Sequence, residues 1–229
     1  VYRALDCNTA KLITIKFLDV KGLSVNQKEN MLNDLKPYVD KLKQNKDNNI
    51  IKYIAVTEAE GDEEMIALSM EYVPGGSLTY ILKFFKSFKE TLAKIYVNQI
   101  IKVLWRLHSR GIVHRDIKTS NLLVDDLGTI KLWDFGFIKE IYESYCLNAK
   151  NEENTGMNGE NVKNTENLSF SSKNLETLDK SNLEGKVPLK PLMNSYYYWP
   201  PEVHLGKWYE EEPSYDIWSL GCVLYEMLT

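Results

Sequence analysis

The pattern of apolar and polar residues divides the chain into a β-rich first third and a mainly helical remainder. Residues 1–18 are rich in β-branched and apolar residues and are interrupted by Asp6-Cys7-Asn8-Thr9, a pattern typical of a β-hairpin. Between residues 24 and 43 apolar residues recur at helical spacing, although Pro37 is expected to kink or restart the helix. Two more strands are predicted at residues 50–57 and 65–72. These elements predict a small lobe made of one sheet and one helix.

A hinge is predicted where Pro74-Gly75-Gly76 interrupts this pattern. Beyond it the apolar spacing becomes helical, in a short segment at 77–84, a long amphipathic segment at 91–109 and an apolar segment at 215–228. We therefore expect two lobes, residues 1–73 and residues 74–229.

A compositionally distinct segment interrupts the second lobe. Asn, Glu, Lys, Ser and Thr dominate residues 148–186, and the apolar residues there follow no period. Such a segment buries too little apolar surface to offset the entropy of ordering it. We expect a disordered insert at about residues 147–187.

Composition and charge limit the class of partner. The chain has 229 residues, of which 44% are hydrophobic, and 28 Lys and Arg face 32 Asp and Glu. This balance offers no excess of cations for a phosphate backbone, so we expect no nucleic acid partner. Three widely spaced cysteines fit a reducing compartment, and we expect the protein in the cytoplasm, with the nucleus not excluded. No run of 18 apolar residues predicts membrane insertion.

Four residues carry the groups that phosphoryl transfer needs. Asp116 and Asn121 lie in a loop between the long predicted helix and a predicted strand at 122–124. Asp134 follows a second short strand, and Lys16 lies on an early strand. Transfer of a γ-phosphoryl group depends on cations, metal ligands and a group that orients the attacking hydroxyl. Their order and their placement on these elements favour phosphoryl transfer over turn-capping roles for the acids.

The motifs around these residues resemble those of the protein kinase family. Residues 114–121, His-Arg-Asp-Ile-Lys-Thr-Ser-Asn, resemble the catalytic loop, and Asp134-Phe135-Gly136 resembles the metal-binding motif. Pro200-Pro201-Glu202 resembles the Ala-Pro-Glu that closes the activation segment, and residues 216–221 resemble the central helix that supports the catalytic loop. The resemblance covers the chain apart from its Asn-rich insert. It implies the α+β, bilobal protein kinase fold, with ATP and Mg²⁺ as cofactors.

The resemblance also implies roles for single residues. Asp116 corresponds to the residue that takes or orients the hydroxyl proton, Asn121 and Asp134 to metal ligands, and Lys16 to the lysine that binds the α- and β-phosphates. Lys118 matches the residue with which Ser/Thr kinases contact the γ-phosphate. The remaining expected sites are the substrate-docking Ser195, the activation-phosphate pocket at Arg115, the hinge backbone of Glu71 and Val73, Met70 guarding the back pocket, and Val1, Thr14 and Leu123 around adenine.

Finer motifs are similar to the branch that contains the MAP kinase kinase kinases. Residues 71–78, 107–113 and 117–118 carry this similarity, whereas residues 194–199, Asn-Ser-Tyr-Tyr-Tyr-Trp, depart from that branch's Gly-Thr-Pro-Tyr-Trp-Met. Because Arg115 precedes Asp116, we also expect activation by a phosphate on Ser or Thr in the insert or near residues 187–195, added by an upstream kinase.

Several positions depart from the family pattern. We expect the Gly-rich loop to precede Val1 and further helices to follow Thr229. The acid that should pair with Lys16 is not obvious: Asp34 is the first choice, and Glu29 and Asp40 are alternatives. In the nucleotide pocket Thr14 replaces the usual Ala, and Trp133 stands before Asp134, where a small residue is common.

Taken together, the sequence predicts a Ser/Thr protein kinase that transfers the ATP γ-phosphate to a protein hydroxyl in intracellular signalling. The alternative is a weak or inactive pseudokinase that serves as a nucleotide-binding scaffold, as the unclear helix acid and the pocket substitutions would allow. A small-molecule kinase is disfavoured by Pro200-Pro201-Glu202 and the long activation segment.

Overall fold

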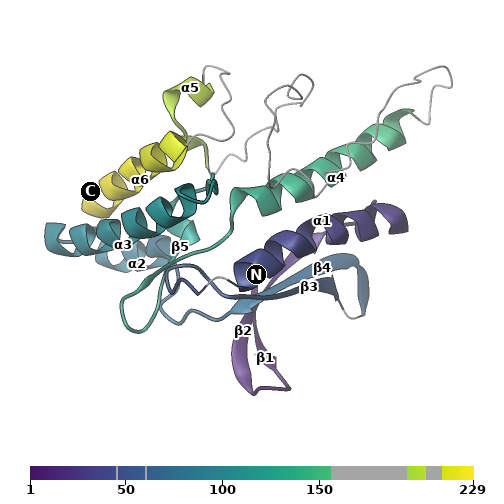
Figure 1. Ribbon diagram of the computed structural model, residues 1–229, viewed down its shortest axis with the longest axis horizontal. Coiled ribbons are helices and arrows are strands. Elements are labelled where there is room, and N and C mark those ends of the chain that lie inside the picture. Colours follow the sequence, from purple (N-terminus) through teal and green to yellow (C-terminus); the bar gives the residue numbers. More distant parts are fainter. Residues whose placement is uncertain (45, 60, 156–194, 205–212) are drawn as a thin grey trace.

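The computed structural model has two lobes joined at the predicted hinge (Figure 1). It describes residues 1–229 except 45, 60, 156–194 and 205–212. An antiparallel sheet and one long helix form the first lobe, and the second lobe is mainly helical. This arrangement confirms the predicted α+β, bilobal architecture.

The first lobe is built on a four-stranded antiparallel sheet in the order β1-β2-β4-β3. Its strands are β1 (Tyr2–Asp6), β2 (Lys11–Asp19), β3 (Tyr53–Ala59) and β4 (Asp62–Glu71). The hairpin of β1 and β2 turns where predicted, since the Asp6 carboxylate accepts the Asn8 backbone N–H at 3.0 Å and the Thr9 hydroxyl at 2.5 Å. Strand β2 pairs with β4, which places Lys16 opposite Leu68 in the middle of the sheet.

Helix α1 (Val25–Lys43) covers one face of this sheet. Ser24 begins it with a capping box: its hydroxyl accepts from the Gln27 backbone N–H, and the Gln27 side chain accepts from the Ser24 backbone N–H. The predicted restart at Pro37 is wrong, because the helix runs through this residue without interruption. The face that packs on the sheet carries Met31, Leu32, Leu35, Val39 and Leu42.

At the hinge, the backbone of Gly75 lies directly against the backbone of the second lobe. A Cβ atom at this position would stand 2.3 Å from the carbonyl oxygen of Val124. Any larger residue would push the two lobes apart here, which explains the glycine.

The second lobe consists of helices around a short two-stranded sheet. The helices α2 (Leu78–Phe85), α3 (Glu90–His108) and α6 (Pro213–Leu228) lie together, with the short α5 (Pro201–His204) nearby (Figure 1). Strands β5 (Leu122–Val124) and β6 (Ile130–Leu132) flank the turn between the catalytic-loop residues and Asp134. Among the described residues, no helix combines the length and apolar character needed to cross a bilayer.

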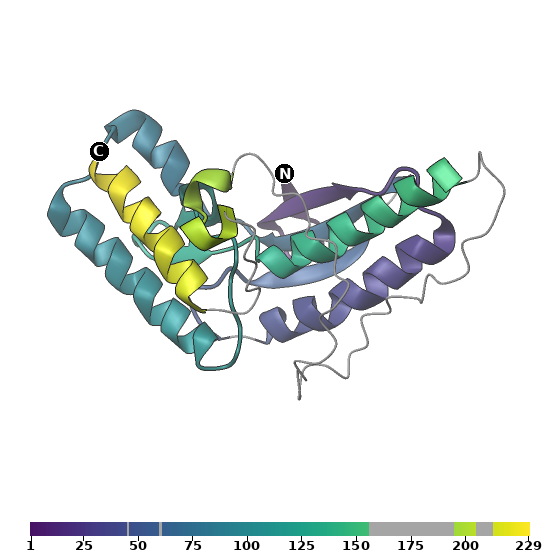
Figure 2. The same cartoon turned by 90° about the horizontal axis from the view of Figure 1, so that it is seen from above.

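Helix α4 (Gly136–Thr155) is the main feature that was not predicted. It begins directly after Phe135 and lies alongside α1 in both views (Figures 1 and 2). Its first half carries an apolar stripe at helical spacing, formed by Ile138, Ile141, Tyr142, Tyr145 and Ala149, all packed in or against the core. The predicted disorder is therefore wrong for residues 148–155, and its remainder lies outside the described residues.

Candidate functional site

The catalytic-loop residues are held in place by a buried acid from helix α6. Asp216 is fully buried, and its carboxylate accepts the backbone N–H groups of His114 and Arg115 at 2.8 Å each, as well as His108 Nε2 at 2.8 Å. Arg115 needs such support because its φ of 68° lies in the left-handed region. The backbone of the loop between α3 and β5 is thus held by Asp216, independently of the contacts that its side chains make in the site.

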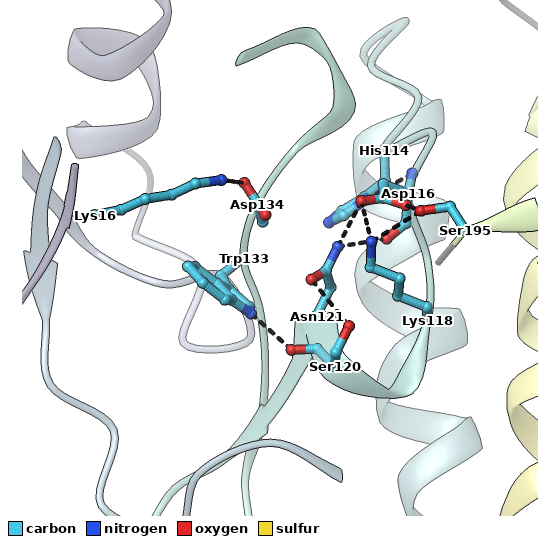
Figure 3. A network of polar contacts seen from close by, with 9 residues as sticks. All are labelled: Lys16, His114, Asp116, Lys118, Ser120, Asn121, Trp133, Asp134 and Ser195. Carbon is cyan, nitrogen blue, oxygen red and sulfur yellow. Dashed lines mark hydrogen bonds and ion pairs between the residues drawn. The ribbon is translucent and has the colours of Figure 1, made fainter. Parts of the chain in front are cut away.

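Asp116 is the centre of a compact polar cluster (Figure 3). Its Oδ2 accepts Lys118 Nζ at 2.8 Å and Asn121 Nδ2 at 2.9 Å, and its Oδ1 accepts the Ser195 hydroxyl at 2.8 Å. Only 7% of Asp116 is exposed. The structure therefore brings together four residues that were predicted to act in one site.

Ser195 reaches this cluster from much later in the chain. Its hydroxyl also accepts Lys118 Nζ at 2.9 Å, so Asp116, Lys118 and Ser195 form a closed triangle of hydrogen bonds. The 3-10 helix that follows, Tyr196–Tyr198, is attached to α6 by the Tyr198 hydroxyl, which donates to Glu226. Ser195 thereby connects Asp116 and Lys118 to the segment that precedes α6.

Lys16 and Asp134 meet on the other side of the site (Figure 3). Lys16 Nζ donates to Asp134 Oδ1 at 2.5 Å, and the ammonium also lies 5.7 Å from the ring centre of Trp133. The Trp133 indole N–H in turn donates to the Ser120 carbonyl at 3.1 Å. The large residue that departs from the family pattern is therefore anchored between Lys16, which was predicted to bind phosphate, and the backbone of Ser120.

The expected adenine site forms a cavity of about 200 Å³ between the lobes. Most of the residues predicted to surround the base line it: Val1, Thr14, Met70, Val73 and Leu123, with Trp133 beside them. Met70 is fully buried, as expected for a residue at the back of the pocket. The Glu71 side chain points elsewhere, since it accepts Lys131 Nζ at 3.0 Å and the Lys52 backbone N–H at 2.9 Å.

The predicted pairing of Lys16 with an acid of helix α1 is not formed in this structure. Asp34 accepts the Tyr145 hydroxyl at 2.7 Å instead, and Lys16 is bound to Asp134. The alternatives Glu29 and Asp40 are both exposed to solvent, whereas Asp34 is half-buried. Asp34 therefore remains the best-placed of the three predicted acids.

Arg115 likewise has a partner from helix α4. Its guanidinium donates to Glu140 Oε2 at 2.7 Å. A carboxylate thus occupies the position that was predicted to receive an activating phosphate.

His114 is a buried structural residue beneath the loop. Its ring stacks on Phe135 with 4.5 Å between centroids, and its Nδ1 accepts the Asp116 backbone N–H at 3.3 Å. Burial lowers the pKa of His114 below its usual value, although the nearby carboxylates of Asp216, Asp116 and Asp134 oppose this shift.

This depressed pKa predicts acid destabilisation. Below the ordinary histidine pKa of 6.5, the unfolded chain takes up a proton at His114 that the folded chain refuses, so protons favour unfolding. The unfolding free energy should fall by up to about 1.4 kcal/mol per pH unit as the pH drops from 6.5 toward the folded-state pKa. Urea denaturation between pH 7.5 and 5 measures this slope, and His114→Gln should flatten it. An equal slope in both proteins would contradict the assignment to His114.

Two structural contacts were not anticipated: Glu140 on Arg115 and Tyr145 on Asp34, whereas the support of the catalytic loop by the helix that begins with Asp216 was expected from the resemblance. The apolar spacing of residues 138–149 did contain a signal for the two α4 contacts.

The side chains predicted to bind metal have suitable chemistry. Asn121 donates through Nδ2 to the backbone carbonyl and the carboxylate of Asp116, so its amide oxygen faces away from Asp116. An amide oxygen and the Asp134 carboxylate are the hard oxygen ligands that Mg²⁺ prefers. Asn121 and Asp134 would therefore suit Mg²⁺ as ligands.

Comparisons with known proteins agree with this geometry. The family model described as protein kinase domain matches residues 1–167. The mitogen-activated protein kinase kinase kinase MST11 of Pyricularia oryzae is 31% identical over 234 residues, which cover 100% of this chain and 21% of the relative. Mitogen-activated protein kinase kinase kinase A of Dictyostelium discoideum is 30% identical over 231 residues, covering 100% of this chain and 20% of the relative.

A plant relative gives the same result. Mitogen-activated protein kinase kinase kinase 3 of Arabidopsis thaliana is 29% identical over 231 residues, covering 100% of this chain and 29% of the relative. The chain thus spans between a fifth and a third of the length of these curated relatives.

Proposed function

Because the chain belongs to the protein kinase family, we propose that it is the catalytic part of a Ser/Thr protein kinase that transfers the γ-phosphate of ATP to a protein hydroxyl. The observation that carries this proposal is the hydrogen-bonded cluster in which Lys118, Asn121 and Ser195 all bind the Asp116 carboxylate. A nucleotide-binding scaffold without catalysis would have no need for this arrangement.

Each residue of the cluster has a part in the transfer. Asp116 is placed to accept the proton of the attacking hydroxyl, because its carboxylate is buried, oriented and supported by donors on both oxygens. Lys118 contacts the transferred phosphoryl group. Ser195 fixes Lys118 by a hydrogen bond and holds in place the loop of this chain that docks the substrate. Bound Mg²⁺, held by Asn121 and Asp134, would neutralise charge on the β- and γ-phosphates.

A second cavity next to the cluster fits a protein substrate. It has a volume of about 880 Å³ and opens beside Lys118 and Ser120, toward helix α6. Aromatic rings of Tyr197, Tyr198, Trp218 and Tyr225 line it. A wide, mainly aromatic surface beside the hydroxyl acceptor suits the side chains that flank a phosphorylated residue better than it suits a small metabolite.

The similarity to MAP kinase kinase kinases supports a place in a signalling cascade. We propose that the substrate is another protein, that an upstream kinase activates this one, and that the protein acts in the cytoplasm. Residues 194–199 differ from the sequence of the family branch. The aromatic side chains of Tyr196–Tyr198 at this position therefore select the substrate.

Loss of the Lys16 ammonium should weaken nucleotide binding. Hydrogen bonds to charged groups contribute about 1.5–3 kcal/mol, so Lys16→Met should weaken ADP binding by about 10-fold to 150-fold. Titration calorimetry with Mg²⁺ and ADP measures this affinity. Lys11→Met is the matched control, since Lys11 lies exposed on the same strand and should leave the affinity unchanged. Equal losses in both variants would contradict a specific role for Lys16.

The type of amino acid that is phosphorylated tests the Ser/Thr assignment. Incubation of the full-length protein with ATP labelled at the γ-phosphate and a generic protein substrate should yield phosphoserine and phosphothreonine. Labelled phosphotyrosine alone would overturn the Ser/Thr assignment. Nucleotide binding without any labelled product would overturn the enzymatic proposal itself.

A further inference from the structure

The Trp133 side chain is held between the catalytic loop and Lys16 (Figure 3). Its indole N–H donates to the Ser120 carbonyl at 3.1 Å, and its backbone N–H donates to the Asn121 carbonyl at 3.3 Å. The residue is half-buried. Two hydrogen bonds to neighbouring residues of one loop therefore fix the orientation of the indole ring.

The face of this ring is turned to a cation that is largely shielded from water. Lys16 Nζ lies 5.7 Å from the ring centre of Trp133, and only 20% of the Lys16 side chain is exposed. An ammonium within about 6 Å of an indole ring is attracted by the negative potential of its face, and the attraction is larger where water is excluded. Trp133 therefore restrains the Lys16 ammonium at this position.

This aromatic contact differs from the ion pair of Lys16 in its relation to the metal. Among the residues that the structure describes, Lys16 forms one ion pair, with Asp134. Asp134 is also a predicted Mg²⁺ ligand, and a carboxylate that coordinates the metal shares its negative charge with it. The Trp133 ring carries no charge, so its attraction for Lys16 does not depend on whether Asp134 coordinates the metal.

Trp133 also lines the cavity of about 200 Å³ that was predicted to receive adenine, together with Thr14 and Leu123. A ring that only forms the floor of this cavity would contact the base. A ring that restrains Lys16 acts instead on the phosphates, which this lysine was predicted to bind. The two roles differ in the part of the nucleotide that they affect, and the anchored ring face beside the ammonium favours the second.

We propose that Trp133 is a positioning residue for Lys16, which holds the ammonium in place for the α- and β-phosphates when Asp134 binds the metal. The inference rests on the proposed kinase function and gives a role to the large residue that departs from the family pattern. Because Trp133 acts through Lys16, removal of its ring should weaken the binding of a phosphate-bearing nucleotide more than the binding of the nucleoside.

The ratio of ADP affinity to adenosine affinity tests this role in the full-length protein. Titration calorimetry with Mg²⁺ and ADP, and separately with adenosine, gives both dissociation constants. Trp133→Leu removes the aromatic face and should lower the ratio about 2-fold to 30-fold, the range of cation–π contacts. Trp133→Phe keeps an aromatic face without the indole N–H and should lower the ratio less. Trp105→Leu is the matched control, because Trp105 is 71% exposed on α3, and it should leave the ratio unchanged.

A double variant shows whether the effect passes through Lys16. In the Lys16→Met background, which has no ammonium, Trp133→Leu should not lower the ratio further. The smaller effect of Trp133→Phe should vanish in that background too, so the test does not depend on the folding of Trp133→Leu.

The outcomes separate this role from the proposed function. A wild-type ratio in Trp133→Leu, whether both affinities fall together or neither changes, would overturn the inference and leave the kinase proposal intact. A loss in Trp133→Leu that persisted in the Lys16→Met background would also overturn it. A wild-type protein that bound neither ADP nor adenosine would instead overturn the kinase function and, with it, the role of Trp133.

Discussion

Asp116→Asn is expected to reduce the phosphotransfer rate by a factor of about 10² to 10⁴, the usual contribution of a positioned acid or base. The amide has the size and shape of the carboxylate, so the contacts around it change little in geometry. It cannot take up the hydroxyl proton, and it presents an NH₂ group where Asp116 has a second acceptor oxygen for its three side-chain donors. The loss should therefore fall on kcat, while the affinity for Mg²⁺ and ADP stays close to that of the wild-type protein.

A matched variant separates this effect from a general loss of negative charge. Asp126 lies exposed in the turn between β5 and β6, and Asp126→Asn should retain the full rate. Both variants can be assayed with saturating ATP and compared with the wild-type protein in a calorimetric ADP titration. A rate for Asp116→Asn within twofold of the wild-type rate would remove Asp116 from the chemistry and return the site to a purely binding role.

The elements that carry these residues follow from local patterns. The turn at Asp6-Cys7-Asn8-Thr9, the capping Ser24 and the glycines of the hinge each act within a few residues, and the strands and helices they delimit occur within a few residues of their predicted bounds. Asp116, Asn121 and Asp134 could be identified because their spacing is a chain-local property. Their convergence with Ser195, across the insert, depended on the resemblance to a family.

What the sequence did not predict is which partner each charged side chain of the site binds in this structure. Asp34 binds Tyr145 where Lys16 was predicted, Asp134 binds Lys16 where a metal was predicted, and Arg115 binds Glu140 where a phosphate was predicted. A linear pattern identifies a group able to form an ion pair, but it does not say which of two partners is occupied in a given conformation. Helix α4 was missed for a related reason. Its polar second half resembles the insert in composition, and its apolar stripe is buried through tertiary packing against α1.

Asp216→Ala is expected to destabilise the fold by about 3–5 kcal/mol, the range found when one partner of a buried charged contact is removed. The substitution would leave the backbone N–H groups of His114 and Arg115 without their acceptor in the protein interior, and it would remove the acceptor of His108. Arg115 would lose its support in a left-handed conformation, so the loop that holds Asp116 should loosen together with the fold.

Urea denaturation monitored by circular dichroism measures this destabilisation, and Ile217→Ala provides the control. Ile217 is the next residue of α6 and 52% exposed, so its truncation should cost less than about 1 kcal/mol. Asp216→Asn should lie between the two, because its amide retains one acceptor oxygen but turns a donor toward the remaining N–H groups. If Asp216→Ala unfolded at the same urea concentration as Ile217→Ala, the carboxylate would not be what fixes the catalytic loop, and the position of Asp116 would have to depend on its contacts with Lys118, Asn121 and Ser195.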